Sequence, residues 1–271
     1  MQPEPEPETA LVFVHGWSAN SGVWAAQTDF FGTRHKVYLV DLPGHEGPPP
    51  VRGAARLRLK FREKPGPTRS VEECGVELAR ALEAEKLKSA RLVGWSLGAQ
   101  VICHAAAAGG YRPASLTLVG ATPCFTAPDG GDWGQPPART RLFVWMMRDD
   151  FKSGLATFVK SLLDHEINLN SEELSVIGRM FLDFPPDEET ALALLDDFVR
   201  ADIRPVLASL GVPVYAVHGA LDRISPPGAV ELWRAAPGFK RAVVMPECGH
   251  APFMTAPGEF NDALGGILGE Q

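Results

Sequence analysis

The stretch Leu92-Val93-Gly94-Trp95-Ser96-Leu97-Gly98-Ala99-Gln100 decides the fold. Residues 90–93 form an apolar run that ends at Gly94, and the alanine-rich residues 97–108 are predicted to form a helix. A single serine lies between them, with a glycine two positions before it and two after it. The G-x-S-x-G pattern predicts a sharp strand-to-helix turn that exposes the serine hydroxyl at the end of a strand. The glycines are needed because the strained serine backbone leaves no room for a Cβ on either side. The alternative is an ordinary turn with a surface serine, and the rest of the chain decides between the two.

Composition bounds the class of protein. The chain has 271 residues, and 45% of them are hydrophobic, so it can bury a large core as one large domain or two small ones. Its net charge of -7 argues against binding to nucleic acid or to an anionic membrane. Apolar runs fall short of the roughly 20 residues of a membrane span, and the acidic, proline-rich start is unlike a signal peptide. We therefore expect a cytoplasmic protein.

The cysteines and histidines give no sign of a metal or disulfide framework. Cys74, Cys103, Cys124 and Cys248 are scattered along the chain, which is typical of reduced thiols in the cytosol. The seven histidines are dispersed as well, without the spacing of a metal site. We expect no metal, no cofactor and a monomeric protein.

The apolar runs alternate with helical segments along most of the chain. Short strands are expected at residues 11–14, 36–40, 90–93, 115–119, 212–218 and 242–245. This rhythm predicts an α/β fold, in which a mostly parallel sheet carries helices on both faces. Residues 11–122 and 206–271 would form this core, after a disordered tail at residues 1–10.

Residues 123–205 interrupt the strand pattern. The segment is mostly helical, with apolar and aromatic residues at helical spacing. Eighty residues are too many for a plain connection, so we expect a helical cap inserted between two strands and lying over the edge of the sheet.

A second interruption, at residues 46–70, is a basic insertion. Between residues 51 and 69 it contains seven basic residues and one acid, Glu63, in a chain that is acidic as a whole. Two interpretations stay open: a solvated surface excursion, or a docking patch for an acidic partner. The basic residues are Arg52, Arg56, Arg58, Lys60, Arg62, Lys64 and Arg69.

Three polar residues stand at the ends of predicted strands in the order Ser96, Asp222, His250. A serine hydroxyl becomes a good nucleophile when a histidine takes its proton, and a carboxylate holds that imidazole in the correct tautomer. Taken singly, Asp222 could form an Asx turn and His250 could be an ordinary loop histidine. Their joint placement favours a catalytic triad.

Such a triad needs two backbone N–H groups aimed at the oxyanion of the tetrahedral intermediate. One is expected from Leu97, directly after the nucleophile, and the other from Trp17, in the loop after the first strand. His15 is expected to bond loop backbone and to have no catalytic role.

At these residues the chain resembles the α/β-hydrolase superfamily over nearly its whole length, and more narrowly the pimeloyl-[acyl-carrier protein] methyl ester esterase family. The more specific elements are the turn Pro123-Cys124-Phe125, the cap motif Asp149-Asp150-Phe151 and Trp95. Trp95 lies within the strand-to-helix turn at residues 94–98, which we call the elbow. The wider pattern includes His15-Gly16-Trp17, Asp41-Leu42-Pro43-Gly44, Asp202-Ile203-Arg204 and Gly249-His250-Ala251-Pro252-Phe253.

The resemblance implies an α/β-hydrolase fold and hydrolysis of pimeloyl-carrier methyl ester to pimeloyl-carrier and methanol, a step of biotin synthesis. It implies Ser96, Asp222 and His250 as the triad, with Trp17 and Leu97 as the oxyanion hole. The substrate would be bordered by Trp17, Trp95 and Phe125 and by the cap residues Phe158, Val159, Lys160, Ser161 and Leu162.

The resemblance also implies an acyl carrier protein as partner, bound by basic residues of the cap. Here the first cap helix, expected at residues 137–163, has five basic residues: Arg139, Arg141, Arg148, Lys152 and Lys160. The later cap is acidic, so we hypothesise that the basic insertion supplements the docking surface. Reversing the charges of Arg56, Arg58 and Arg62 would then weaken binding of a carrier-linked ester.

Three alternatives remain open at this point. The chain could be a broad short-chain carboxylesterase, or a carbon–carbon bond hydrolase using the same triad. It could also be a non-catalytic binder on a hydrolase scaffold, although such binders are recognised by loss of the triad, and here all three residues are present.

Overall fold

A seven-stranded sheet forms the centre of the computed structural model, which describes residues 9–48, 53–61, 70–164 and 169–270. All neighbouring strands pair in parallel, in the order β3-β2-β1-β4-β5-β6-β7. The predicted α/β fold is thereby confirmed. The strands are β1 (Leu11–Val14), β2 (Val37–Val40), β3 (Ala54–Leu57), β4 (Arg91–Trp95), β5 (Ser115–Val119), β6 (Val214–Gly219) and β7 (Phe239–Met245).

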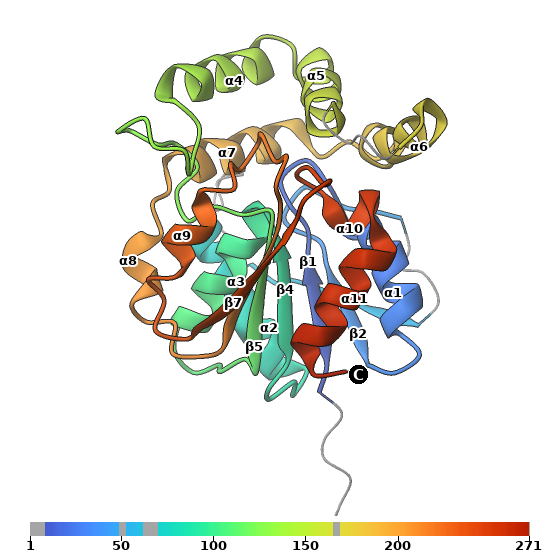
Figure 1. The fold of residues 1–271 in the computed structure, drawn as a ribbon, viewed down its shortest axis with the longest axis vertical. Helices are drawn as coiled ribbons and strands as arrows, with labels where there is room; N and C mark the ends of the chain where they lie inside the picture. Colours follow the sequence, from blue (N-terminus) through green and yellow to red (C-terminus); the bar gives the residue numbers. More distant parts are fainter. Residues whose placement is uncertain (1–8, 49–52, 62–69, 165–168, 271) are drawn as a thin grey trace, which may run out of the picture.

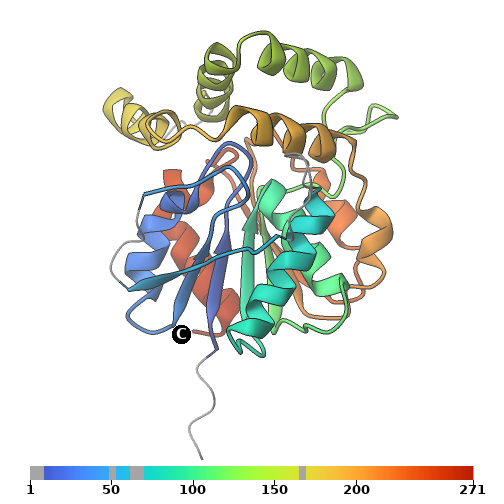
Figure 2. The same ribbon diagram turned by 180° about the vertical axis from the view of Figure 1, so that it is seen from behind.

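Helices cover both faces of this sheet. α1 (Ala25–Phe31) and α11 (Pro257–Leu268) lie on one face, and α2 (Val71–Ala84) and α3 (Leu97–Ala107) lie on the other (Figures 1 and 2). Shorter helices join them: η1 (Ser21–Trp24), α8 (Arg204–Leu207), α9 (Ala229–Trp233) and α10 (Pro252–Thr255). Because the central strands are covered on both sides, every residue of β1 and β5 is buried, and β1 is entirely apolar, as is expected for parallel strands.

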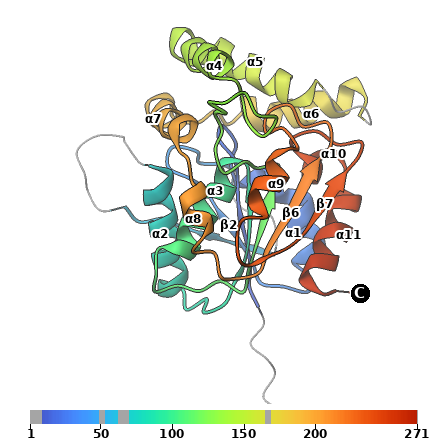
Figure 3. The same cartoon turned by 60° about the vertical axis from the view of Figure 1, so that its left-hand side comes forward.

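Four helices between β5 and β6 lie above the carboxyl ends of the strands (Figures 1 and 3). We call them the cap helices: α4 (Pro137–Asp149), α5 (Phe151–Leu163), α6 (Ser171–Leu182) and α7 (Glu188–Arg200). The division of the chain into a core and a cap at residues 123–205 stays a prediction. Among the described helices, none combines the length and the apolar character that crossing a membrane requires.

The expectation of one long helix at residues 137–163 was wrong. The chain forms two helices, because Asp150 between them is extended, with φ -149° and ψ 97°. The Asp150 carboxylate accepts a hydrogen bond from the Ser153 N–H at 3.0 Å and so caps α5. An aspartate in this position satisfies one of the N–H groups that a helix start leaves unpaired.

The basic insertion contains a strand that the sequence pattern did not reveal. β3 pairs in parallel with β2 and forms one edge of the sheet. Its residues are Ala-Ala-Arg-Leu, and alanine has low strand propensity. Only the last residue is fully buried, as can occur in an edge strand, so the sequence shows no clear apolar alternation. Arg52, Arg62, Lys64 and Arg69 of the insertion and residues 1–8 of the expected tail lie outside the described residues.

Candidate active site

Ser96 occupies the turn between β4 and α3 in a conformation that few non-glycine residues adopt, with φ 54° and ψ -117°. Its N–H donates to the carbonyl of Val119 on the neighbouring strand at 2.9 Å. A Cβ on Gly94 would lie 2.4 Å from the Gly98 oxygen, and a Cβ on Gly98 would lie 2.4 Å from the His15 oxygen. Both glycines are therefore required by space, as the sequence predicted.

Asp222 lies in the loop after β6 and uses its two carboxylate oxygens differently. Oδ1 accepts hydrogen bonds from the N–H groups of Ile224 and Ser225, both at 2.8 Å, which is an Asx turn. Oδ2 faces Nδ1 of His250, 2.8 Å away. The Asx turn is therefore confirmed, and it fixes the carboxylate that contacts the His250 imidazole; the catalytic role of Asp222 stays a prediction.

The Asp222 carboxylate is ionised although it is fully buried. Burial by itself raises its pKa, but the neighbouring His250 and His218 imidazoles outweigh burial and lower the pKa to about 2. An ionised carboxylate at Oδ2 keeps the proton of His250 on Nδ1 and leaves Nε2 free to act as a base.

Trp95, the residue before the serine, connects the elbow to the histidine loop. Its indole N–H donates to the backbone carbonyl of His250 at 2.9 Å, and its ring packs against that imidazole with a centroid separation of 5.3 Å. The side chain is fully buried. Trp95 therefore helps to fix His250 above Ser96.

Replacing Trp95 with phenylalanine should test this contact. The change removes the indole donor and leaves the buried His250 carbonyl unpaired, so we expect a loss of about 1–3 kcal/mol in the free energy of unfolding. We also expect kcat for ester hydrolysis to fall about tenfold through displacement of His250. Urea unfolding and steady-state kinetics measure the two effects. Trp145→Phe is the matched control, because Trp145 is 60% exposed on α4; equal behaviour of the two variants would contradict the prediction.

Ser96 and His250 line the same small inner cavity of about 20 Å³. This is room for about one water molecule. Its walls are aromatic and aliphatic side chains from the elbow, the loop after β1, the cap and the Asp222 loop. They are Trp17, Trp95, Phe125, Phe143, Phe158, Leu162, Leu195, Phe198 and Ile224.

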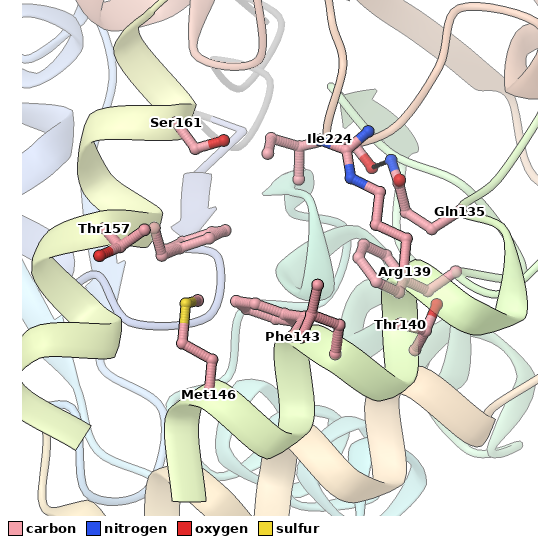
Figure 4. Close-up of a pocket in the computed structure, with 11 residues that line it drawn as sticks. Gln135, Arg139, Thr140, Phe143, Met146, Thr157, Ser161 and Ile224 are labelled. Atoms are coloured by element: carbon pink, nitrogen blue, oxygen red, sulfur yellow. Dashed lines mark hydrogen bonds between the residues drawn. The ribbon is translucent and has the colours of Figure 1, made fainter. Parts of the chain in front are cut away.

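A larger outer cavity of about 170 Å³ continues from it between α4 and α5. The two cavities share Phe125, Phe143, Phe158 and Ile224 as walls. Figure 4 shows Thr157 and Ser161 of α5 across the cavity from Phe143 and Arg139 of α4. Arg139 and Leu142 are exposed, so this end of the cavity opens to solvent. The structure thus provides an apolar passage from the surface to Ser96.

The rings of Trp17, Phe143 and Phe158 meet where the two cavities join. Each ring contacts the other two, with centroid separations of 5.2–5.7 Å. These three rings, two of them from the cap, therefore border the passage between the outer cavity and Ser96.

Most of the predicted substrate-binding residues line these cavities, but two do not. Trp17, Trp95, Phe125, Phe158 and Leu162 line the inner cavity, and Ser161 lines the outer one. Val159 is buried at another face of α5, and Lys160 is exposed. The reason is helical geometry: residues 158, 161 and 162 share one face, and residues 159 and 160 do not.

Phe143, Leu195, Phe198 and Ile224 line the inner cavity and were missed from the sequence. The first three come from α4 and α7, where their helical spacing marks an apolar face without saying whether that face meets the core or a cavity.

The predicted oxyanion loop is fixed from two sides. The Leu42 N–H donates to Nε2 of His15 at 2.9 Å, so the His15 proton must sit on Nδ1, which lies 2.7 Å from the Gly16 oxygen. His15 thus bonds loop backbone, as predicted. On the other side, the Trp17 indole N–H donates to the Ala191 carbonyl of α7 at 2.8 Å. Among the described residues, neither the Trp17 nor the Leu97 backbone N–H has a protein acceptor.

Arg56 of the basic insertion supports this region from within the protein. Its Nε lies 2.9 Å from Asp41 Oδ2, and its guanidinium also donates to the Gly47 and Pro48 carbonyls. Asp41 in turn accepts from the Ser21 N–H at 2.7 Å. Arg56 is therefore engaged inside the fold, and charge reversal there would disturb the loops and not only a docking surface.

Stability should depend on pH through His45, which is buried beside His15. Burial is the main cause that lowers the pKa of His45 to about 3. In the unfolded chain the His45 imidazole is protonated below about pH 6.5, whereas in the folded protein it is protonated only below about pH 3. The free energy of unfolding should therefore decrease as pH falls through this window, by up to about 1.4 kcal/mol per pH unit for this group.

The His45→Asn variant tests this dependence. Asparagine can keep the hydrogen bond that Nδ1 makes to the Pro43 carbonyl at 2.7 Å, but it does not titrate. Urea unfolding at several pH values between 6.5 and 4.5 should give a shallower decrease for the variant than for the wild type. Equal slopes would contradict the assignment.

The fold and this arrangement define the class of the protein. The model of the α/β-hydrolase family matches residues 11–263, so the chain belongs to the α/β-hydrolase family. Within this family its curated relatives include pimeloyl-[acyl-carrier protein] methyl ester esterases, which confirms the resemblance predicted from the sequence. The relative from Nitrosomonas europaea is 30% identical, covering 92% of each chain. The relative from Aeromonas hydrophila is 29% identical, covering 96% of this chain and 95% of that one.

Solved structures agree on the fold. An esterase from Thermogutta terrifontis matches with a TM-score of 0.72 at 20% identity, over 97% of this chain and 91% of the other. An enol-lactonase from Burkholderia xenovorans matches with a TM-score of 0.74 at 18% identity, over 98% and 94%. At these identities the likeness concerns the fold alone. In the described part of the chain, no group of three or more His, Cys, Asp or Glu residues is placed to hold a metal.

Proposed function

We propose that this protein is a serine carboxylesterase that hydrolyses pimeloyl-[acyl-carrier protein] methyl ester to pimeloyl-[acyl-carrier protein] and methanol. The observation that carries the proposal is that Ser96 and His250 line one cavity, with Asp222 on the far side of the imidazole and an apolar passage leading outward. Relatives that carry this esterase's name and align over more than nine-tenths of both chains support the substrate.

The reaction proceeds through an acyl-enzyme. Ser96 Oγ attacks the ester carbonyl carbon while His250 Nε2 accepts the hydroxyl proton. The N–H groups of Trp17 and Leu97 donate to the oxyanion that forms. The intermediate collapses, and His250 returns the proton to the leaving methoxide, which departs as methanol. Water then attacks the acyl-serine with His250 again as base, and the carboxylic acid is released.

The aromatic passage suits the acyl chain of this substrate. The methyl ester would sit at Ser96 in the inner cavity, and the methylene chain would run past Phe143 and Phe158 into the outer cavity. The carrier-linked end then emerges beside Arg139. An apolar chain gains by leaving water along such a passage, at about 25 cal/mol for each Å² of apolar surface buried.

We propose that the acyl carrier protein docks on exposed basic residues around this opening and that the basic insertion supplements this surface. Arg139 and Arg141 are exposed on α4, and Arg58 is exposed after β3. Arg148 already pairs with Asp196 across the cap, so it contributes less free charge. A positive surface of this kind steers an acidic partner and raises its association rate.

Charge reversal tests the docking surface. Arg141→Glu and Arg58→Glu should each raise KM for a carrier-linked methyl ester several-fold and leave the kinetics on a small methyl ester unchanged. Lys240→Glu makes the same charge change on β7, and it should alter neither substrate's kinetics. If both docking variants have the wild-type KM for the carrier-linked ester, the proposed docking surface is wrong.

The substrate itself is tested by comparing two esters with purified protein. We expect kcat/KM for pimeloyl-carrier methyl ester to exceed that for a short-chain methyl ester of a simple acid by at least tenfold, measured as methanol release. Rescue of a biotin auxotroph that lacks its own esterase should accompany this preference. Good turnover of short esters without rescue would instead favour a broad short-chain carboxylesterase.

We also propose that the enzyme acts as a monomer in the cytoplasm. All four cysteines are buried, and in the described part of the chain none of them forms a disulfide, which suits a reducing compartment.

A further inference from the structure

A second histidine lies against the carboxylate of the proposed triad. His218, near the end of β6, is almost fully buried, with 1% of its surface exposed. Its Nε2 lies 2.8 Å from the Ser225 carbonyl oxygen and 3.3 Å from Asp222 Oδ2. Both neighbours are acceptors, so Nε2 must carry the proton. The N–H is thus directed at Ser225 and lies beside Asp222.

The contacts of Asp222 are completed by this histidine. Oδ1 has two backbone donors, and Oδ2 has His250 Nδ1 at 2.8 Å and the N–H of His218 at 3.3 Å. A carboxylate offers about four lone-pair positions; three of them here meet a donor, and the His218 N–H lies beside the fourth. His250 approaches from the loop after β7 and His218 from β6 itself, so the two imidazoles fix Oδ2 from different elements.

His218 acts on the same loop a second time through Ser225. The Ser225 N–H bonds Asp222 Oδ1, and the Ser225 carbonyl is held by His218. The Ser225 peptide therefore connects His218 to the orientation of the carboxylate. His218 lines neither the inner nor the outer cavity, so it would act on a substrate only through Asp222 and His250.

We propose that His218 is a positioning residue for the Asp222–His250 pair, through an Nε2–H that is held by the Ser225 carbonyl and lies beside Asp222 Oδ2. This inference rests on the proposed ester hydrolysis. The neighbouring positive hydrogen spreads the negative charge of Oδ2 and orients this atom toward His250 Nδ1. Without His218, the Ser225 peptide would lose its support, and Oδ2 would be held less firmly toward His250 Nδ1.

Three substitutions separate positioning from a purely structural role. His218→Gln keeps an N–H close to the place of Nε2, His218→Asn keeps an amide that is too short to reach it, and His218→Leu removes polarity altogether. We expect kcat to fall about tenfold or more in the Asn and Leu variants with KM unchanged, and to stay within about threefold of the wild type in the Gln variant.

The second readout is the hydrogen bond between His250 Nδ1 and Asp222 Oδ2, measured by the NMR chemical shift of the Nδ1 proton in Ser96→Ala protein. Because the Ser225 peptide and Asp222 lose the contact with His218, the Asn and Leu variants should change this chemical shift, and the Gln variant should not. Loss of packing alone would not separate Gln from Asn in this way.

The outcomes are decisive for each proposal separately. If the wild type hydrolyses esters and the Asn, Leu and Gln variants share its kcat and its Nδ1 proton chemical shift, the positioning role is refuted. It is equally refuted if Gln is as impaired as Asn. If the Leu variant fails to fold, the Gln and Asn pair still decides. An inactive wild type on every ester would refute the proposed function, while the Nδ1 proton chemical shifts of the variants would still test the contact with Asp222.

Discussion

Replacing Ser96 with alanine should lower kcat for ester hydrolysis by about 10⁶-fold, the scale seen when a triad nucleophile is removed from a serine hydrolase. The variant loses the atom that forms the acyl-enzyme, so the two-step route through a covalent intermediate is closed. Residual turnover would come from the oxyanion hole and from substrate binding alone. A burst of methanol equal to the enzyme concentration, expected for a wild type that accumulates acyl-enzyme, should disappear as well.

The same variant should fold normally. Alanine keeps the backbone at φ 54° no worse than serine does, and the Ser96 N–H bond to Val119 is a backbone bond that the change leaves in place. The free energy of unfolding should stay within about 1 kcal/mol of the wild type. Ser175→Ala, an exposed position on α6, is the matched control and should retain full activity. Turnover by pure Ser96→Ala protein at more than a hundredth of the wild-type rate would refute the role of Ser96.

Replacing Asp222 with asparagine should lower kcat by about 10⁴-fold, as expected when the acid of a triad becomes an amide. The structure gives the reason. Two backbone N–H groups occupy Oδ1 at 2.8 Å, so the amide oxygen of asparagine must take that place. The amide NH₂ then points at Nδ1 of His250 and forces this atom to become an acceptor. The His250 proton moves to Nε2, where the imidazole can no longer take the proton of Ser96.

This prediction separates chemistry from stability. Because Oδ1 keeps its turn, the loop at 222–225 should persist, and the loss should appear in kcat with little change in KM. Asp29→Asn, on the exposed surface of α1, is the control and should behave as the wild type. Because the pKa of Asp222 is about 2, this carboxylate stays ionised until the pH falls well below 4. Protonation of Asp222 should therefore not reduce the activity above that pH. Near-normal kcat in the variant would show that His250 has its tautomer fixed by another group.

The parts of the site that the sequence could predict are those set by the backbone. Gly94 and Gly98 flank Ser96 because any side chain there would collide with backbone atoms, and such a requirement leaves a spaced pattern in the sequence. Asp222 and His250 were found because parallel strands end at one edge of the sheet, so residues after β6 and β7 must approach Ser96.

The remainder depends on packing between distant segments, which leaves no local pattern. Phe143 and Phe198 lie on different cap helices, and each looks like an ordinary core residue in its own helix. β3 was missed because an edge strand of alanine and arginine carries no alternation. The break at Asp150 was predictable in principle, since an Asp followed three residues later by Ser153 is a plausible cap, but the surrounding apolar spacing favoured one continuous helix.

The hydrogen bond from the Trp17 indole to the Ala191 carbonyl connects the cap to the loop that carries the proposed oxyanion N–H. Because that N–H and this indole belong to one residue, we expect a displacement of α7 to affect the proposed oxyanion hole. Coupling between two binding events is reciprocal. If an acyl chain bound against the cap favours binding of the oxyanion, then an oxyanion in the hole favours binding of the acyl chain by the same free energy. The exchange rate of the Trp17 indole proton should therefore fall when a transition-state analogue occupies Ser96. Recognition of the acyl chain at the cap and stabilisation of the oxyanion would then depend on the same coupling free energy.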